Sequence, residues 1–151
     1  MSLKMSRAER EQFLADVHVG IISIADPGRG PLTAPIWYDY EPGGELWVIT
    51  AQSSRKGRLL ETIDRFSLCA QTEVAPYKYV SVEGSIASIR PSDFESDERA
   101  MAHRYLGAEF GESYLEATGG AAARAEEVQL RVAMRPERWL TTDYSKQFPQ
   151  G

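Results

Sequence analysis

The chain has 151 residues and a formal net charge of −5, with 42% hydrophobic and 26% charged residues. This length fits one ordinary domain that buries about 70% of its unfolded surface, and the composition is globular rather than disordered. The acidic balance argues against general nucleic-acid binding, which calls for a basic face. No apolar run approaches the roughly 18 residues of a membrane span, and no signal-peptide pattern begins the chain. We therefore expect a soluble, cytoplasmic protein.

We expect a single domain over residues 1–151, because the chain has no internal repeats and no linker long enough to separate a second domain. Residues 1–4 are interpreted as a possible tag or disordered start, and residues 145–151 as a polar tail. No structural role is expected of residues 1–3.

The first predicted element is a helix, because Ser6 and Glu9 have the spacing of a capping box and apolar residues follow on one face. Three strands come next, separated by turns rich in glycine and proline, and we expect them to form an antiparallel meander. The helix is predicted over 7–16 and the strands over 18–25, 32–40 and 45–51.

The rest of the chain alternates between strand and helix patterns. Gly84 lies in the middle of a long alternating strand and predicts a bulge or sharp bend, as barrels need at their corners. The predicted elements are a helix over 55–64, strands over 66–72 and 77–89, a helical region opened by Ser92 as N-cap, a helix over 109–117, a flexible connection over 117–125, and strands over 128–134 and 139–142. Six or seven short antiparallel strands with helices between them favour a mainly β, α+β fold, a small barrel with helices packed at its ends.

The basic turn between Thr50 and Leu59 is the first candidate site. Ser54 is a potential helix cap, and Arg55 and Lys56 occupy the first helical turn, with Arg58 close behind. Cations are unfavourable at a helix start, which carries a partial positive charge and exposed N–H groups. The same arrangement suits an anion, above all a phosphate. A solvated basic turn explains the charges equally well.

Side-chain chemistry in the rest of the sequence is sparse. The two histidines, His18 and His103, are too far apart to indicate a metal site, and no metal ligands are predicted. No serine has the sequence pattern of an activated nucleophile, and Cys69 is interpreted as a buried structural thiol in a strand. No catalytic side chain is assigned. Since the chain combines a candidate anion site with few catalytic side chains, we expect a bound cofactor to supply its chemistry.

The aromatic strand Pro35–Tyr40 is the second candidate site. Its proline favours a sheet edge, and a flat heteroaromatic ring could lie against its backbone while a phosphate reaches the basic turn beyond Thr50. The alternative is that these aromatic residues simply fill the core of the barrel.

Several segments, in their order and spacing, resemble the pyridoxamine 5′-phosphate oxidase-like flavin-binding split-barrel superfamily. The resemblance covers about residues 17–89 and, more weakly, 128–144. The segments are Ala34–Tyr40, Gly44–Thr50, Ser54–Lys56 with Leu59 and Leu60, Phe66–Cys69 and Tyr79–Gly84.

This resemblance implies a split barrel that forms a homodimer, with cofactor sites at the subunit interface. The cofactor ring would lie against the second strand, and the phosphate would be held at the basic turn. Trp139 would be supplied by the last strand of the partner subunit. The implied cofactor-binding residues are Pro35, Ile36, Trp37, Tyr38, Ile49, Thr50, Ser54, Arg55, Lys56, Tyr79 and Trp139.

The sequence departs from true pyridoxamine 5′-phosphate oxidases, which carry an arginine–histidine element near the C-terminus, because no histidine follows His103. It is more similar to the small flavin or deazaflavin reductases, so FMN and the deazaflavin coenzyme F-420 both stay open as cofactors. Arg29, Arg55, Lys56, Arg58 and Lys78 are candidates for the basic groove that the longer, anionic F-420 would require.

The first functional hypothesis is an oxidoreductase that passes hydride between this cofactor and a small planar substrate. A non-catalytic flavin, deazaflavin or haem module for storage or sensing is the alternative. The third is a barrel without a cofactor that binds a phosphorylated ligand or a protein.

Overall fold

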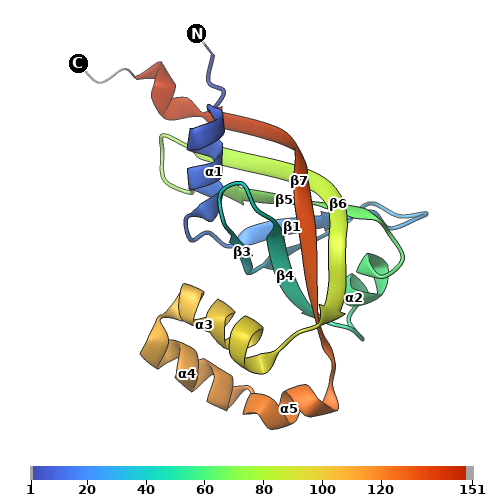
Figure 1. The fold of residues 1–151 in the computed structure, drawn as a ribbon. Helices are drawn as coiled ribbons and strands as arrows, with labels where there is room; N and C mark the ends of the chain where they lie inside the picture. The colour runs from blue at the N-terminus through green and yellow to red at the C-terminus, as the bar shows by residue number, and fades with distance from the viewer. Residues whose placement is uncertain (1, 149–151) are drawn as a thin grey trace.

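Residues 2–148, the part of the chain that the computed structural model describes, form a curved antiparallel sheet of seven strands (Figure 1). The strands are β1 (Gly20–Ile24), β2 (Leu32–Ile36), β3 (Tyr38–Tyr40), β4 (Leu46–Ala51), β5 (Arg65–Gln71), β6 (Lys78–Pro91) and β7 (Gln129–Asp143). They pair in the order β2-β1-β5-β6-β7-β4-β3. The expected α+β split barrel is confirmed.

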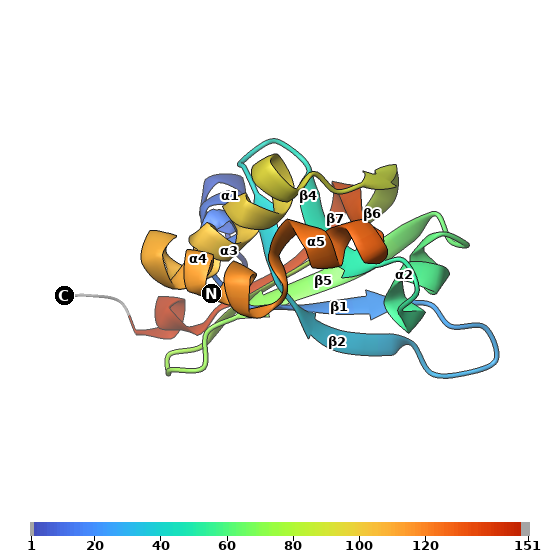
Figure 2. The same ribbon diagram turned by 90° about the horizontal axis from the view of Figure 1, so that it is seen from below.

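Five α-helices accompany the sheet in the described range. α1 (Arg7–Ala15) lies toward the chain termini, and α2 (Arg55–Leu60) directly follows β4. α3 (Arg99–Leu106), α4 (Ala108–Ala117) and α5 (Gly120–Glu126) lie at the opposite end in Figure 1, and Figure 2 shows them from below as one group. We call these three the helical cap. A π-helical turn (Phe94–Glu98) leads into α3, and a 3-10 turn (Tyr144–Gln147) follows β7.

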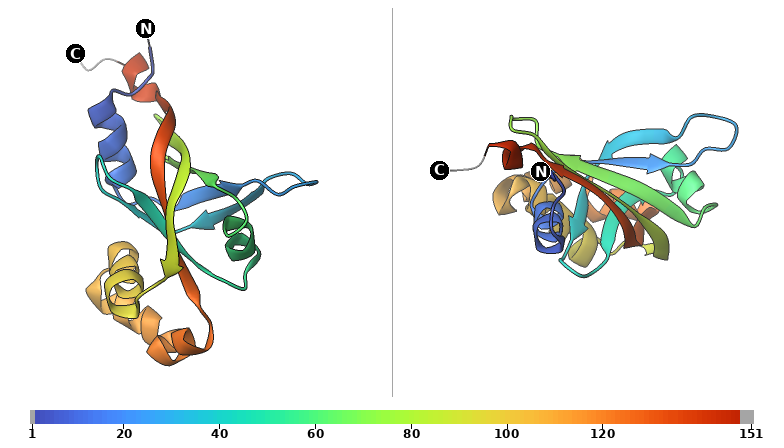
Figure 3. Two further views of the ribbon diagram at one scale, coloured as in Figure 1. Left: turned by 45° about the vertical axis from the view of Figure 1, so that its right-hand side comes forward. Right: turned by 90° about the horizontal axis from the view of Figure 1, so that it is seen from above.

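The barrel is split between β2 and β3, which are consecutive in the chain but form the two opposite edges of the sheet. β2 pairs with β1, β3 pairs with β4, and Trp37 alone separates them. The sheet therefore curls back on itself without closing, as the two views of Figure 3 show. The predicted single strand over 32–40 and the three-strand meander were wrong, because the chain crosses from one barrel wall to the other at Trp37.

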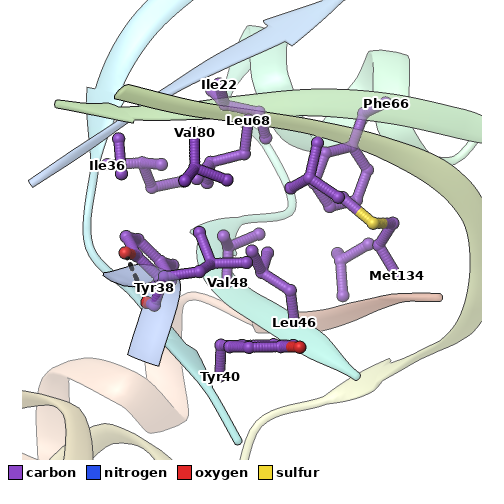
Figure 4. Close-up of a cluster of buried hydrophobic side chains, with 14 of the residues drawn as sticks. Ile22, Ile36, Tyr38, Tyr40, Leu46, Val48, Phe66, Leu68, Val80 and Met134 are labelled. Atoms are coloured by element: carbon purple, nitrogen blue, oxygen red, sulfur yellow. Dashed lines mark hydrogen bonds between the residues drawn. The ribbon is translucent and has the colours of Figure 1, made fainter. Parts of the chain in front are cut away.

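The core fills the inside of this curved sheet with alternate residues of each strand. β4 shows the pattern plainly, since Leu46 and Val48 are fully buried while Trp47 and Ile49, which alternate with them, are only partly covered. All seven strands contribute side chains to this core, and Figure 4 shows how some of them converge, among them Ile22, Tyr38, Leu68 and Val80. Burying each aliphatic side chain of this size contributes about 1.5–3 kcal/mol.

β6 and β7 form one long, bent ribbon. The register between them shifts between Glu83 and Gly84, which confirms the predicted bulge. A Cβ atom at Gly84 would lie 1.7 Å from the backbone oxygen of Arg135, so no larger residue fits there without a backbone shift. The two short strands predicted at 128–134 and 139–142 were wrong as separate elements. They form one strand, because β7 pairs with β6 on both sides of the bulge. At the bulge, Glu137 accepts a hydrogen bond from the Ser85 N–H at 2.7 Å.

The helix predictions were most accurate where the N-cap residue interacts with residues close to it in the sequence. Ser6 and Glu9 form the predicted capping box of α1, and Ser54 caps α2. Ser92 is not the cap of the later helical region, because Asp93 accepts from the Ser96 N–H and the Ser92 hydroxyl bonds Glu98 instead. The predicted flexible connection over 117–125 was also wrong, since most of it forms α5.

Both ends of the described chain meet beside α1. The carbonyl of Leu3 accepts a hydrogen bond from the N–H of Asp143 at 2.8 Å. Lys146 contacts the carbonyl of Lys4 and the carboxylate of Glu9. Residue 1 of the expected start and residues 149–151 of the expected tail lie outside the described residues.

Candidate functional site

The basic turn lies where β4 ends and α2 begins. Ser54 accepts from the Gly57 N–H at 3.0 Å, donates to the Ala51 carbonyl at 2.6 Å, and contacts the Thr50 hydroxyl at 3.1 Å. A Cβ at Gly57 would lie 2.3 Å from the Ala51 carbonyl oxygen, so glycine allows the helix to start this close to the strand. The Ser54 hydroxyl therefore has its hydrogen bonds inside the protein and acts as a cap rather than as a free donor.

The backbone N–H groups of Arg55 and Lys56 are the donors that this geometry leaves free. They occupy the first two positions of α2, where an α-helix has no internal partner for its N–H groups. Within residues 2–148 neither group donates to another atom, and the Lys56 side chain forms no ion pair. Two N–H groups and one ammonium thus remain at this turn for an anion.

Acidic residues brought in by folding offset part of the positive charge at this turn. Asp26, from the turn between β1 and β2, forms an ion pair with Arg55. Glu127, beyond α5, accepts a hydrogen bond from Ser53. These interactions join residues 29 and 74 positions apart in the sequence, and no local pattern indicated them. Lys56 is consequently a stronger candidate than Arg55 for holding an anion.

Trp37 marks the point where the helical cap meets the barrel. Its indole ring stacks on Tyr105 of α3 at 4.9 Å and 6°, and it lies 5.4 Å from Tyr114 of α4. Its neighbour Ile36 is a core residue, and Pro35 is exposed on β2. Trp37 is therefore the member of the aromatic strand whose side chain faces the cap.

Both the backbone and the side chain of Tyr38 form hydrogen bonds within the protein. The side chain is fully buried, and its hydroxyl donates to the Leu14 carbonyl at 2.7 Å. Its N–H donates to the Tyr105 hydroxyl, and its carbonyl accepts from Tyr105 and Arg104. Burial raises the pKa of both tyrosines, so both hydroxyls stay protonated and able to donate. The expected space for a ring against the backbone of Tyr38 is thus taken by α3.

A cavity of about 140 Å³ opens between the cap and the outer face of β4 and β7. Its walls combine aromatic and aliphatic side chains with a buried ion pair, in which Arg124 Nε lies 2.9 Å from Glu98 Oε1. The lining residues are Trp37, Ile49, Glu98, Met101, Tyr114, Leu115, Arg124 and Gln129. Only Trp37 and Ile49 of these were sequence candidates. The cap residues were missed because the sequence shows them as an ordinary helical core, and only the fold turns that core toward Trp37.

Tyr79 and Trp139 lie far from this turn within one chain. Thr50 pairs with Leu130 of β7, whereas Trp139 lies nine residues further along that strand, and Tyr79 pairs with Thr142 beyond it. Nine residues of extended strand span roughly 30 Å. Trp139 packs beneath Arg10 of α1 at 4.5 Å and beside Tyr40. One subunit therefore brings nine of the eleven candidate residues to the barrel wall around β2, β4 and α2, and places two at the opposite end.

The described residues contain no group of three or more histidine, cysteine, aspartate or glutamate side chains placed to hold a metal ion. In the same part of the chain, no helix is long and apolar enough to cross a membrane.

Solved structures share this fold over most of the chain. A conserved hypothetical protein from Mycobacterium tuberculosis matches with a TM-score of 0.75 at 21% identity, covering 99% of this chain and 92% of its own. An F-420 reductase matches with a TM-score of 0.70 at 19% identity, covering 86% of this chain and 94% of its own. An FAD- and haem-binding protein from Mycobacterium smegmatis matches at 0.62 and 14%, covering 93% and 72%.

These likenesses establish the fold. A putative pyridoxamine 5′-phosphate oxidase from Listeria innocua is also among the matches, with a TM-score of 0.55 at 9% identity over 82% of this chain and 87% of its own. The expected likeness to pyridoxamine 5′-phosphate oxidase-like split barrels is thereby confirmed, and several proteins of this shape are named for flavin-type cofactors. No protein-family model and no curated protein sequence matches the chain.

Proposed function

We propose that this protein binds a flavin-type cofactor, FMN or the deazaflavin F-420, and transfers hydride between it and a small planar substrate. One observation carries the proposal. Two consecutive residues of β4 connect the cavity with the basic turn. Ile49 lines the cavity under the helical cap, and the Thr50 hydroxyl contacts Ser54, the N-cap residue of α2. The names of proteins with the same fold support a cofactor of this class.

The cofactor would supply the hydride chemistry, and the protein would supply binding, orientation and exclusion of water. Lys56 and the free N–H groups of residues 55 and 56 would hold its phosphate, with Arg55 adding a hydrogen bond if it leaves Asp26. Trp37 and Ile49 would lie beside the ring. Thr50 and Ser54 would fix the turn, while Ile36 and Tyr38 would shape the strand from inside the core. No side chain is assigned as a general acid or base.

Cofactor titration of the purified protein tests this proposal. We expect FMN or F-420 to bind with a change in its visible spectrum. Replacing both Arg55 and Lys56 with alanine should weaken binding by about 1–3 kcal/mol for each charge-assisted hydrogen bond that is removed. Arg58→Ala, an exposed change in the same helix, is the matched control and should leave the affinity for FMN nearly unchanged, since Arg58 is a candidate only for the groove of the longer F-420. No binding of either cofactor would refute the proposal. Unchanged affinity in the double variant would show that the cofactor phosphate does not bind at this turn.

Rapid-mixing reduction of the loaded protein separates an enzyme from a carrier. A reductase should oxidise its reduced cofactor faster when quinones or enones are added. A storage or sensing module should show no acceleration, and that result would favour the non-catalytic alternative.

We further propose a homodimer, which would bring Tyr79 and Trp139 of the partner subunit to the β4–α2 turn. The outer face of the sheet supports this proposal with a row of residues paired across five strands, Pro35, Ile21, Cys69, Ser81 and Leu140. Leu140 is 63% exposed and Ile21 38%. Ser81 and Cys69 between them are half-buried, so Cys69 is less covered than the buried thiol expected from the sequence. Exposed apolar residues gathered on one sheet face are typical of an interface.

Leu140→Asp should therefore convert a dimer into a folded monomer, as measured by sedimentation velocity together with circular dichroism. Val74→Asp, at a 79% exposed residue outside the row, is the control and should remain dimeric. A wild-type protein that sediments as a monomer would contradict the proposal.

A further inference from the structure

A second cavity, of about 260 Å³, lies between α1, the turn that joins β3 to β4, and the bulge of β7. We propose that it is a separate anion site, which binds the phosphate group of a small phosphorylated molecule. It shares no residue with the basic turn, where the cofactor phosphate is proposed to bind. The site is therefore proposed independently of the cofactor.

Arg10 of α1 is the first donor in this cavity. Its guanidinium group lies over the Trp139 ring, 4.5 Å from the ring centroid, and this contact holds the side chain in place. Within residues 2–148 the Arg10 side chain forms no ion pair, and its buried Nε has no hydrogen-bond partner. An unpaired buried donor is unfavourable. The terminal N–H groups of Arg10 are thus available to an acceptor from outside the chain.

The bulge of β7 brings a second arginine, Arg135, to the same cavity. Residues five positions apart lie on opposite faces of a regular strand, yet Met134 and Trp139 both pack against the core. The register shift between Glu83 and Gly84 allows this, because a bulge redirects the side chains that follow it. Arg135 is exposed at this point, and no ion pair in the described range includes it. It supplies a second cation from a different element.

Tyr40 supplies an uncharged donor. Its side chain is 3% exposed, and its hydroxyl accepts a hydrogen bond from the Gly43 N–H at 3.3 Å. Burial raises the pKa of Tyr40, so the hydroxyl stays protonated. In the part of the chain that the structure describes, no acceptor is assigned to this proton. Because Tyr40 and Gly43 both line the cavity, the hydroxyl lies at its wall.

Two carboxylates also line the cavity, but each has a cationic partner. Glu11 pairs with Arg7 at 3.3 Å, and Glu137 pairs with Arg65 at 3.1 Å. The carboxylates therefore do not occupy the donors of the two arginines described above. Those two positive charges are left without an ion-pair partner on the wall of one cavity.

This set of donors suits a phosphate group better than a carboxylate. Guanidinium groups match phosphate oxygens with paired N–H donors. A tetrahedral phosphate presents oxygens to donors that arrive from several directions, whereas a carboxylate has only two oxygens in one plane. The cavity is smaller than the roughly 300–1,000 Å³ of pockets for drug-sized ligands. The molecule that carries the phosphate is therefore expected to be small.

Inorganic phosphate is the probe that tests this site. It is titrated at constant ionic strength into ¹⁵N-labelled Arg55→Ala/Lys56→Ala protein, in which the basic turn no longer competes. The three tryptophan indole signals are followed, with Trp139→Phe used for assignment. We expect a saturable shift of the Trp139 signal, while Trp37 and Trp47, which contact other parts of the chain, stay unchanged. Acetate should bind at least about tenfold more weakly.

Arg135→Gln is the most informative variant, because an exposed residue can be changed without unpacking the core. It should weaken phosphate binding by about tenfold or more, and Arg10→Gln should do the same. Arg138→Gln is the matched control, since this exposed arginine of β7 pairs with Glu83 and does not line the cavity. It should leave the phosphate affinity unchanged. Should Arg10→Gln fail to fold, Arg135→Gln decides.

A cofactor titration separates this cavity from the cofactor site, because Trp139 of the partner subunit is also proposed to reach the cofactor. One equivalent of FMN or F-420 per wild-type subunit should leave the phosphate affinity measured at Trp139 unchanged. Loss of phosphate binding would show that the cavity belongs to the cofactor site, and would overturn the inference.

An unmoved Trp139 signal, equal binding of acetate, or unchanged affinity in Arg135→Gln would also overturn it. These failures are distinguishable from failure of the proposed function. A protein that binds cofactor but shows no phosphate shift at Trp139 refutes only the second anion site. A protein that binds phosphate there but neither FMN nor F-420 refutes only the proposed function.

Discussion

The barrel interior and the helical cap meet at Trp37, but different interactions stabilise them. The barrel encloses a continuous apolar cluster to which strands from every part of the chain contribute. The cap presents polar and charged side chains on most of its surface and has few fully buried residues of its own, Met101, Ala102 and Leu115 among them. Apolar burial involves no proton uptake and is not screened by ions, whereas charge pairs depend on pH and are weakened by salt.

Charged side chains link the first two helices of the helical cap. Glu112 of α4 pairs with Arg99 at 3.0 Å and His103 at 2.7 Å, both from α3. Arg104 of α3 then reaches the barrel side through the Tyr38 and Ala15 carbonyls. The region that walls the cavity beside Trp37 is therefore stabilised in part by charged groups, which respond to salt and pH. A site that must admit and release ligands is expected in such a region.

A matched pair of phenylalanine-to-alanine substitutions measures most directly how the packing of the barrel differs from that of the helical cap. Phe66 is 3% exposed inside the barrel, whereas Phe110 is 65% exposed on the cap. Phe66→Ala should lower the free energy of unfolding by about 3–5 kcal/mol, because it leaves a cavity in a packed core. Phe110→Ala should change it by less than about 0.5 kcal/mol. Denaturant unfolding measures both, and similar decreases would mean that the cap is packed as tightly as the barrel.

The bulge of the β6–β7 ribbon should be the next most sensitive position. Gly84→Ala should cost about 1–3 kcal/mol, because the added methyl group collides with the backbone carbonyl of Arg135. Gly30→Ala, where no atom lies within 4 Å of the added Cβ, is the control and should be nearly neutral. Thermal unfolding of the two variants gives the comparison. Equal melting temperatures would contradict the close approach at the bulge.

The ion pairs at the junction of cap and barrel should give a smaller, pH-dependent effect. Burial tends to raise the pKa of Asp97, but hydrogen bonds from Arg90 and from the Asp93 N–H, with the charges of Arg90 and Arg131, hold it below the usual 3.8. A lowered carboxylate pKa stabilises the fold above the unfolded-state value, and this contribution is lost as the pH falls through the folded-state pKa.

Asp97→Asn should therefore cost about 1–2 kcal/mol near pH 7 and much less near pH 2. Denaturant unfolding at both pH values tests this, with Glu126→Gln at an exposed acid of α5 as the control. An equal decrease in stability at the two pH values would show that Asp97 acts through its shape rather than its charge.

Local patterns predicted the parts of the fold that depend on neighbouring residues. The capping box of Ser6 and Glu9, the cap at Ser54 and the bulge at Gly84 each follow from interactions that operate over a few positions. The strand alternation of β6 likewise identified its buried face. These features were correct because hydrogen bonding and side-chain periodicity within one element decide them.

The predictions failed where distant segments decide the outcome. The strand over 32–40 looked continuous, but its halves pair with different neighbours, so the break at Trp37 depends on barrel curvature. The connection over 117–125 looked flexible because of its glycines, yet Arg124 of α5 is held by Glu98 from 26 positions away. No local pattern contains that partner.

The candidate site also has features that the sequence predicted and features that only the folded structure decided. The sequence by itself determined the anion-binding potential of the β4–α2 turn, because the Ser54 cap and the two free N–H groups follow from a strand running into a helix. Only the tertiary structure decided that Asp26 offsets Arg55 and leaves Lys56 available, and that α3 occupies the backbone of Tyr38. It likewise placed Glu98 and Arg124 opposite Trp37. The physical reason is that charge balance and cavity shape are set by residues that only folding brings together.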